Sequence, residues 1–262
     1  MMKQRQFGNT GILVSPLGLG TVKLGRDKGV KYPERFTIPD DKSAGQLIAL
    51  AKDMGINLID TAPAYGNSEE RLGTLLKGQR QDWVICSKVG EEYSDGGSSF
   101  DFSAKHTRFS IERSLQRLKT DMIDIVLVHS NGDDLDIINH KEVLTELDRC
   151  KQQGLIRSFG VSTKTVEGGL CAAEKTDAVM ATFNFDYRDE QAVIDFCGKH
   201  QKGLLIKKAF ASGHLCQQSK DPVQASMDFI FSHQGVSSVI VGTINPQHLQ
   251  ENVAAVEKSL AE

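Results

Sequence analysis

The sequence lacks the features that mark membrane, secreted and metal-binding proteins. No run of apolar residues approaches the roughly 18 that a membrane-spanning helix needs. No apolar segment follows the charged start at residues 1–6, so we expect no secretory signal. The 5 cysteines are odd in number and widely spaced, without a C-x-x-C pair. These absences argue against a zinc site and predict free thiols in a reducing cytoplasm.

An excess of basic residues is also missing. The formal net charge is −3, which argues against nucleic acid or an anionic membrane surface as a partner. With 39% hydrophobic and 25% charged residues, the chain can bury a large core. Its length of 262 residues suits one α/β barrel, and we expect residues 1–262 to form a single domain.

Short, nearly continuous apolar runs recur along the chain, as is typical of parallel strands that are buried on both faces. Between them lie helical patterns, as at residues 44–51, 110–118 and 246–260, and Pro246 suits the first turn of the last one. Eight strand–helix units in a chain of this length predict a closed (β/α)8 barrel. The predicted strands are Pro16–Thr21, Asn57–Thr61, Trp83–Val89, Asp124–Ser130, Ile156–Ser162, Ala178–Asn184, Leu204–Ala209 and Ser237–Gly242.

The alternative fold is an open, doubly wound sheet. Against it, the first strand is not followed by the G-x-G-x-x-G that its phosphate-binding loop usually carries. Ahead of the first barrel strand, residues 4–7 and 12–14 flank Gly8–Gly11, and we expect a β-hairpin that closes the bottom of the barrel. The Gly/Ser-rich composition of residues 94–99 predicts a mobile loop after the third strand.

Polar side chains stand where three neighbouring strands end, and barrels of this kind hold their active sites at that end. Asp60 ends the second strand, Lys88 lies near the end of the third, and His129 ends the fourth; Tyr65 follows Asp60 by 5 residues. Each of them alone also fits a structural role, as a turn cap, a packing residue, a solvated lysine or a core histidine. Because the three strands are neighbours, we expect the four side chains to form one catalytic cluster.

These four residue types suit carbonyl reduction. A buried lysine needs a counter-charge, which Asp60 on the adjacent strand can supply. The Lys88 ammonium favours phenolate, so we expect it to lower the pKa of Tyr65 from about 10 and to make the phenol a better acid near neutral pH. His129 can donate a hydrogen bond to a substrate carbonyl and orient it.

Several segments resemble those of one enzyme family. Residues 55–66, GINLIDTAPAYG, resemble the G-x-x-x-x-D-T-A-x-x-Y-G signature of the aldo-keto reductase superfamily. Residues 154–162, GLIRSFGVS, resemble the family's G-x-I-R-x-x-G-V-S. Residues 68–73, 83–88 and 118–129 resemble the family segments that continue the signature and carry its lysine and histidine, so the resemblance spans nearly the whole chain.

The resemblance implies an oxidoreductase that reduces aldehydes or ketones, or that runs the reverse oxidation of an alcohol or sugar. The catalytic tetrad would be Asp60, Tyr65, Lys88 and His129. Hydride would come from a bound nicotinamide cofactor and the proton from Tyr65. A monomer is the usual state in this family, and nothing in the residues excludes a dimer.

The resemblance also implies that the cofactor, NADP(H) rather than NAD(H), lies extended across the barrel mouth. Thr163 stands where the family has an asparagine, Met180 replaces a glutamine, and Lys207 replaces an aromatic residue that stacks on the nicotinamide. The last helix offers its N-terminus to the 2′-phosphate, but His248 stands where many members have an arginine, and an unperturbed histidine is mostly neutral near pH 7. The residues expected to bind the cofactor are Gly20, Thr21, Asp60, Ser162, Thr163, Met180, Lys207, Lys208, Ala209, Phe210, Ser212, Gly213, Gly242, Thr243, His248, Glu251 and Asn252.

The substrate pocket is expected to be open and polar. Residues 130–134, which follow His129, lack the aromatic residue found there in many family members. No long segment follows the last predicted helix, and the loop after the seventh strand is expected to be short. Such a pocket would suit small or polar carbonyls, such as sugar-derived aldehydes.

Two other functions fit parts of the pattern. A barrel aldolase could use Lys88 or Lys207 as a Schiff-base nucleophile, although Tyr65 and His129 fit that chemistry less well. A non-catalytic nicotinamide-binding sensor or regulatory protein is favoured by the altered contacts at Met180 and Lys207. The complete tetrad argues against the sensor, because a sensor has no need of Tyr65.

Overall fold

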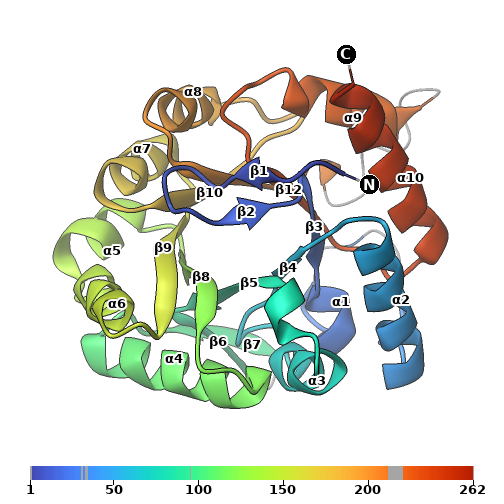
Figure 1. Ribbon diagram of the computed structural model, residues 1–262. Helices are drawn as coiled ribbons and strands as arrows, with labels where there is room; N and C mark the ends of the chain where they lie inside the picture. The colour runs from blue at the N-terminus through green and yellow to red at the C-terminus, as the bar shows by residue number, and fades with distance from the viewer. Residues whose placement is uncertain (1, 31, 33–34, 95, 212–220, 262) are drawn as a thin grey trace.

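The structure, a computed structural model, describes residues 2–30, 32, 35–94, 96–211 and 221–261. Within them, eight parallel strands close into a barrel that is surrounded by helices, as predicted (Figure 1). The open-sheet alternative is wrong, because the last strand in the order pairs back to the first. In order around the barrel the strands are β10 (Ala178–Thr182), β11 (Gly203–Lys207), β12 (Ser238–Val241), β3 (Leu17–Gly20), β4 (Leu58–Asp60), β5 (Val84–Val89), β8 (Ile123–His129) and β9 (Ile156–Ser162).

The helices form where polar caps precede amphipathic segments. Asp40, Ser103 and Asn245 each accept a hydrogen bond from a backbone N–H in the first turn of the helix that follows, and Pro246 begins the last helix as predicted. The helices are α1 (Val22–Gly25), α2 (Asp41–Asp53), α3 (Ser68–Leu75), α4 (Ala104–Leu118), α5 (Asp134–His140), α6 (Val143–Gln152), α7 (Val166–Lys175), α8 (Gln191–Lys199), α9 (Pro222–Phe231) and α10 (Pro246–Ser259), with a 3-10 turn at Arg80–Asp82.

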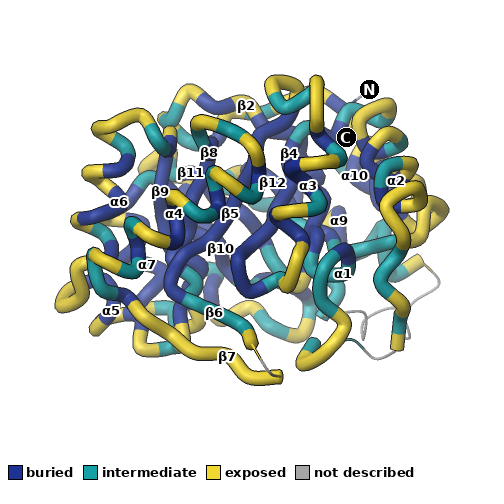
Figure 2. The backbone as a smooth tube through the Cα atoms, turned by 90° about the horizontal axis from the view of Figure 1, so that it is seen from below, coloured by how far each residue is buried: buried dark blue, intermediate teal, exposed yellow. Residues whose placement is uncertain are grey.

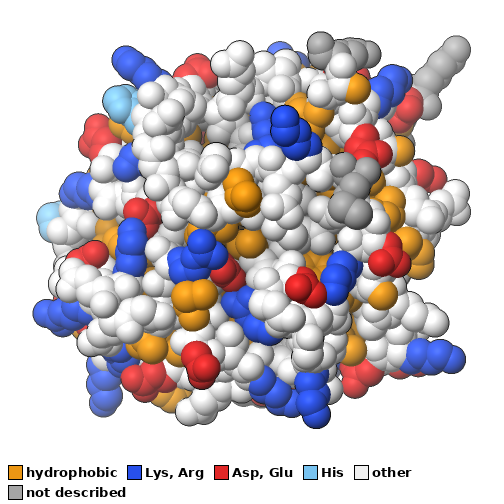
Figure 3. Space-filling model, in the orientation of Figure 1, with side chains coloured by type: hydrophobic (Ala, Val, Ile, Leu, Met, Phe, Trp, Pro, Cys, Tyr) orange, Lys and Arg blue, Asp and Glu red, His pale blue; other side chains and the backbone are white. Residues whose placement is uncertain are grey.

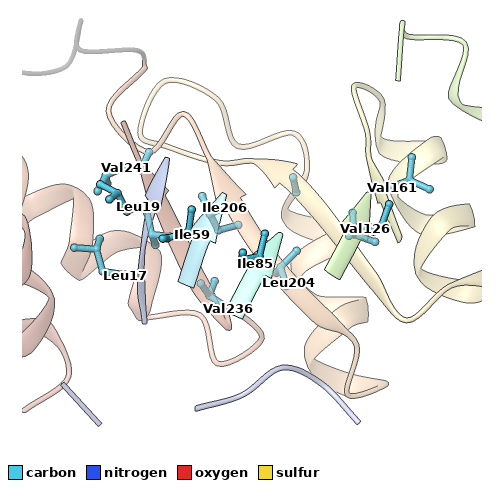
Figure 4. Packing of buried hydrophobic residues seen from close by; sticks show 14 of the residues in the cluster. Leu17, Leu19, Ile59, Ile85, Val126, Val161, Leu204, Ile206, Val236 and Val241 are labelled. Carbon is cyan, nitrogen blue, oxygen red and sulfur yellow. The ribbon is translucent and has the colours of Figure 1, made fainter. Parts of the chain in front are cut away.

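Buried apolar residues form two layers, because successive side chains of a strand point to opposite faces. One layer lies between the strands and the helices and includes Ile59, Ile85 and Val126, which Figure 4 shows among their neighbours. The other layer fills the barrel interior and includes Leu58 and Leu127. The interior is therefore a packed core, and only the ends of the barrel are open to chemistry.

The N-terminal hairpin closes one end of the barrel, as predicted. Its strands β1 (Arg5–Gln6) and β2 (Leu13–Val14) pair antiparallel and cross the near end of the barrel in Figure 1. Phe7, Ile12 and Val14 are buried and belong to the cluster that fills the barrel interior. On this closed face, side chains of both charges are interspersed (Figure 3).

A second hairpin stands at the opposite end, where the sequence predicts a mobile loop. That prediction is wrong for the described residues: β6 (Glu91–Ser94) pairs antiparallel with β7 (Gly97–Phe100). The hairpin projects beyond the barrel at the bottom of Figure 2. Gly90 makes the turn into it, with a φ of +99° and with no room for a Cβ, which would lie 2.4 Å from Phe102. Ser98 closes the pairing by donating a hydrogen bond of 2.5 Å to Glu91.

The described part of the chain has neither a candidate membrane span nor a candidate metal site. None of its helices has the length and apolar character needed to cross a membrane. No group of three or more His, Cys, Asp or Glu side chains comes together there as metal ligands would. Four cysteines are free thiols, and Cys216 lies outside the described residues.

Candidate active site

The alternation of side chains explains why three polar residues meet at the open end of the barrel. β4, β5 and β8 are neighbours, and the last inward-facing position of each holds Asp60, Lys88 or His129. The inward-facing residues two positions earlier are Leu58, Cys86 and Leu127. A change from apolar to polar residues at the end of three adjacent strands creates a compact polar cluster above the packed interior.

Asp60 and Lys88 form a buried ion pair. The Lys88 Nζ lies 2.6 Å from Asp60 Oδ1 and also donates to the Thr61 carbonyl at 2.9 Å. The two side chains are only 4% and 2% exposed. Burial by itself lowers the pKa of Lys88, but its surroundings, first among them the carboxylate of Asp60, together outweigh burial and raise that pKa above its usual value. Lys88 is thus held as an ammonium, which makes it a poor Schiff-base nucleophile.

Tyr65 lies beside this pair, on the loop between β4 and α3. Its ring centroid is 4.8 Å from the Lys88 Nζ, and its hydroxyl is 3.5 Å from Asp60 Oδ2. Gly66 fixes the turn that follows: its φ is +63°, and a Cβ would lie 2.1 Å from the Gly25 carbonyl oxygen. Only glycine fits so close an approach.

The predicted lowering of the Tyr65 pKa is wrong. Burial raises the pKa of Tyr65, the Lys88 ammonium opposes it, and the Asp60 carboxylate adds to it, so the net change is upward. The reason is that desolvation of a phenolate outweighs a lysine whose charge is already paired with Asp60. Tyr65 is held as a neutral phenol, with the ammonium placed to stabilise the phenolate that forms when the proton leaves.

His129 completes the cluster and is paired with a residue that the sequence did not single out. The rings of His129 and Tyr65 meet edge to face, with centroids 6.3 Å apart. The His129 Nδ1 lies 2.6 Å from Oε2 of Glu91, on the β6 hairpin. Burial lowers the pKa of His129, and the contact with Glu91 opposes that change without reversing it. The signal that could have found Glu91 is a charged residue two positions after the end of β5, a strand of the site.

Three of the predicted cofactor-binding residues form a second polar cluster at the open end of the barrel, where β9 and β11 end. Lys207, at the end of β11, donates to the Ser162 hydroxyl at 2.8 Å and to the Thr163 carbonyl at 2.7 Å. Burial lowers the pKa of Lys207 to about 8, and the carboxylate of Glu190 opposes this effect. The Thr163 hydroxyl is buried and has no hydrogen-bond partner among the described residues. Ser162 and Thr163 therefore offer groups that suit an amide of a ligand.

The other predicted cofactor residues occupy varied environments. Thr21 is fully buried, and its hydroxyl donates to the Asp60 carbonyl at 2.9 Å, which ties two strand ends together. Met180 is part of the barrel core. Gly20 ends β3; Lys208, Ala209 and Phe210 follow β11; Gly242 and Thr243 follow β12; and His248, Glu251 and Asn252 lie on α10, the first two exposed and the third buried. Ser212 and Gly213 lie outside the described residues.

The loops around the mouth are described in part. The predicted short loop after β11 lies mostly outside the described residues, which stop at 211 and resume at 221. The loops after β8 and β9 are joined, because Asp134 accepts hydrogen bonds from the backbone N–H groups of Lys164 and Thr165, at 2.9 and 2.8 Å. This junction fixes the part of the rim next to His129.

The residues of the rim fit a nicotinamide dinucleotide. Ser162 and Thr163 offer hydroxyl groups near the tetrad. Further along, β11, β12 and β3 are consecutive in the barrel, so the residues that directly follow these strands are neighbours at the rim. The residues after β12 lead to the N-terminus of the 14-residue helix α10, and the positive end of the helix dipole there favours an anion.

Comparisons with known proteins agree on one family. Residues 16–223 match the model of the Aldo/keto reductase family. A crystal structure from Pseudomonas aeruginosa, assigned as an aldo-keto reductase, is 57% identical and superposes with a TM-score of 0.90, covering 98% of this chain and 95% of that one. L-galactose dehydrogenase of Arabidopsis thaliana is 26% identical over 96% of this chain and 87% of its own length. The holo form of an aldo-keto reductase from Bacillus halodurans, 24% identical, shares the fold with a TM-score of 0.83 and covers 98% of this chain and 91% of its own.

Proposed function

Because the chain belongs to the aldo/keto reductase family and is therefore an NAD(P)H-dependent carbonyl oxidoreductase, we propose that its chemistry takes place at Asp60, Tyr65, Lys88 and His129. The observation that carries this proposal is the position of the Lys88 ammonium. It is fixed 2.6 Å from Asp60 and 4.8 Å from the ring centre of Tyr65, at the open end of the barrel. A buried cation beside a neutral phenol is the arrangement that a proton donor to a carbonyl oxygen needs.

In this proposal each member of the tetrad has one task. The nicotinamide cofactor supplies the hydride when it is bound. Tyr65 donates its phenolic proton to the carbonyl oxygen, and Lys88 stabilises the phenolate that remains. Asp60 keeps Lys88 charged and in place. His129 contacts the substrate oxygen and orients the carbonyl. In the reverse direction, the Tyr65 phenolate takes the proton of an alcohol.

We propose that Ser162 and Thr163 hold the carboxamide of the cofactor and that the loops after β11 and β12 hold its phosphates. NADP(H) remains the better prediction from the family resemblance. The N-terminus of α10 supports binding of an anion there. His248 is exposed in the first turn of that helix, so it can reach a phosphate from solvent.

Replacement of His248 by arginine tests where the 2′-phosphate binds. We expect His248→Arg to tighten binding of NADPH by about fivefold, the effect of an exposed ion pair worth about 1 kcal/mol. Binding of NADH, which lacks the 2′-phosphate, should not change. Isothermal titration calorimetry with both cofactors measures the two effects. Gln250→Arg is the control, because it adds the same charge at an exposed position of the same helix. Equal tightening of NADH and NADPH by His248→Arg would contradict the assignment.

For the substrate we propose small or polar carbonyls, or the matching sugar alcohols. Support comes from the polar side chains at the mouth, Glu91, His129, Ser162 and Lys207, and from a relative that is named as a sugar dehydrogenase. We further propose that residues 1–262 act as one domain, as a monomer, in the cytoplasm.

The direct test follows the absorbance of NADPH and NADH with a panel of aldehydes, ketones and aldoses. Turnover with small polar carbonyls, faster than with steroids or long aliphatic aldehydes, supports the proposal. Binding of a cofactor with no turnover in either direction would point instead to a sensor, and turnover confined to bulky apolar carbonyls would refute the proposed substrate class.

A further inference from the structure

Glu91 and His129 belong to different elements that meet only at the barrel mouth. His129 is the last residue of β8, whereas Glu91 begins β6, the first strand of the projecting hairpin. Their side chains are 22% and 12% exposed, and Nδ1 lies 2.6 Å from Oε2. The contact lies off the direction of a linear hydrogen bond, so the charge of the Glu91 carboxylate is its main effect on the ring. No other described group forms a hydrogen bond with Nδ1.

The two nitrogens of His129 therefore have different surroundings. Nδ1 is enclosed in the protein and faces a carboxylate, which favours a proton on that nitrogen. Nε2 has no hydrogen bond with any described residue, and the His129 side chain, 22% exposed, meets the Tyr65 ring edge to face. A neutral imidazole with its proton on Nδ1 has a lone pair on Nε2 and can only accept a hydrogen bond there.

We propose that Glu91 is a positioning residue for His129: it keeps a proton on Nδ1 and leaves Nε2 to contact the substrate oxygen, as an acceptor from an alcohol and, when the ring is protonated, as a donor to a carbonyl. The inference rests on the proposed function, because it requires that the substrate oxygen lies at Nε2. It adds a residue and a dependence on pH to the tetrad. His129 transfers no proton to the substrate. It accepts a hydrogen bond from an alcohol or donates one to a carbonyl oxygen.

The charged groups around His129 set the direction of the pH effect. Glu91, on β6, favours the imidazolium, while burial, Lys88 on β5 and Lys207 on β11 disfavour it. Tyr65, on the loop after β4, is held neutral. The net effect lowers the pKa of His129 from its usual value of 6.5, so the ring is neutral at pH 7 and becomes charged at lower pH. Carbonyl reduction should gain from acidification, and alcohol oxidation should gain from a rise in pH.

Glu91 itself stays ionised over this range. Burial raises the pKa of Glu91, but its contacts with His129 and Ser98 outweigh burial and lower that pKa to about 2. Below the pKa of His129 the pair therefore consists of a carboxylate and an imidazolium. Above the pKa of His129 the carboxylate remains and continues to favour the tautomer with the proton on Nδ1.

The test uses Glu91→Gln, which keeps the size of the side chain and removes its charge. An opposite charge in contact with an ionisable group shifts its pKa by about 1 to 3 units, so the His129 pKa should be lower in the variant by about one unit or more. ¹⁵N NMR of the imidazoles measures both the pKa and the tautomer in the intact protein, without turnover. His129→Asn identifies the signal among the 7 histidines.

Glu92→Gln is the matched control. Glu92 is the next residue of β6, but it contacts His106, at 3.3 Å, and Arg113 on α4, away from the tetrad. It should leave the titration of His129 unchanged. Glu91→Asp retains a carboxylate and should restore part of the His129 pKa, which separates the charge from the general integrity of the hairpin.

Kinetics give a second readout. In Glu91→Gln, kcat/KM for carbonyl reduction below neutral pH should fall by about tenfold, which matches a change of one pH unit in the population of imidazolium. The inflection of its pH profile should move with the NMR titration, and the Kd of the cofactor should not change. If His129 titrates in Glu91→Gln as it does in the wild type, the inference is overturned. A wild type that turns over no carbonyl would refute the proposed function instead, and the NMR titration would still decide the role of Glu91.

Discussion

Replacement of Lys88 by methionine should lower the free energy of unfolding by about 3–5 kcal/mol, because it leaves the Asp60 carboxylate buried without a partner. Asp60 is 4% exposed, and its Oδ1 has the Lys88 Nζ at 2.6 Å. Methionine keeps the length and the apolar stem of lysine, so loss of packing contributes little. Denaturation by urea, followed by circular dichroism, measures the change.

A double variant separates the buried charge from other effects of the substitution. Asp60→Leu combined with Lys88→Met removes both charges, and it should recover much of the lost stability because an apolar pair can replace a buried ion pair. Lys52→Met is the control for a surface pair. Lys52 also has its Nζ 2.6 Å from a carboxylate, that of Asp82, but both side chains are about 40% exposed. Its loss should cost at most about 1 kcal/mol. An equal cost for Lys52→Met and Lys88→Met would show that burial of the pair is unimportant.

Replacement of Tyr65 by phenylalanine should reduce kcat for carbonyl reduction by about 10²- to 10⁴-fold, the usual contribution of a positioned acid. The variant loses only the hydroxyl group, which donates a long hydrogen bond of 3.5 Å to Asp60. The fold and the Asp60–Lys88 pair should therefore persist. Stopped-flow measurement of hydride transfer reports the chemical step, and calorimetry reports the Kd of the cofactor, which should not change.

Tyr93→Phe is the matched control for this substitution. Tyr93 lies on β6 near the mouth, and its hydroxyl donates to the Lys28 carbonyl at 3.1 Å, outside the tetrad. Its loss should leave kcat within about twofold, because a surface hydrogen bond contributes about 1 kcal/mol to stability and nothing to proton transfer. Tyr65→Phe with wild-type kcat would show that another group is the acid and would contradict the proposal.

Much of the barrel could be predicted from the sequence because buried parallel strands leave a strong pattern. All eight apolar runs are strands, and the change to a polar residue at Asp60 and His129 marks the end of a strand correctly. Neighbouring strands then bring the tetrad together, so the arrangement of the site follows from topology. The closing hairpin was predictable for the same reason, since apolar residues flank its turn.

The errors arise where composition and charge do not report burial. Residues 97–99 are small and polar, and their pairing with β6 depends on tertiary contacts that composition does not reveal. Because the sequence does not predict this hairpin, it also does not predict that Glu91, the first residue of β6, contacts His129. The Tyr65 pKa was predicted in the wrong direction, because the sequence shows the lysine but not the desolvation of the phenol.

The central claim is that hydride reaches a substrate carbonyl at the Tyr65 cluster. The most direct measurement uses reduced cofactor with deuterium at C4 of the nicotinamide, a small polar aldehyde, and mass spectrometry of the product. We predict that the wild-type protein forms an alcohol with deuterium on the former carbonyl carbon, and that Tyr65→Phe binds the cofactor but forms almost none. Product without deuterium, or equal labelled product from Tyr65→Phe, would contradict this account.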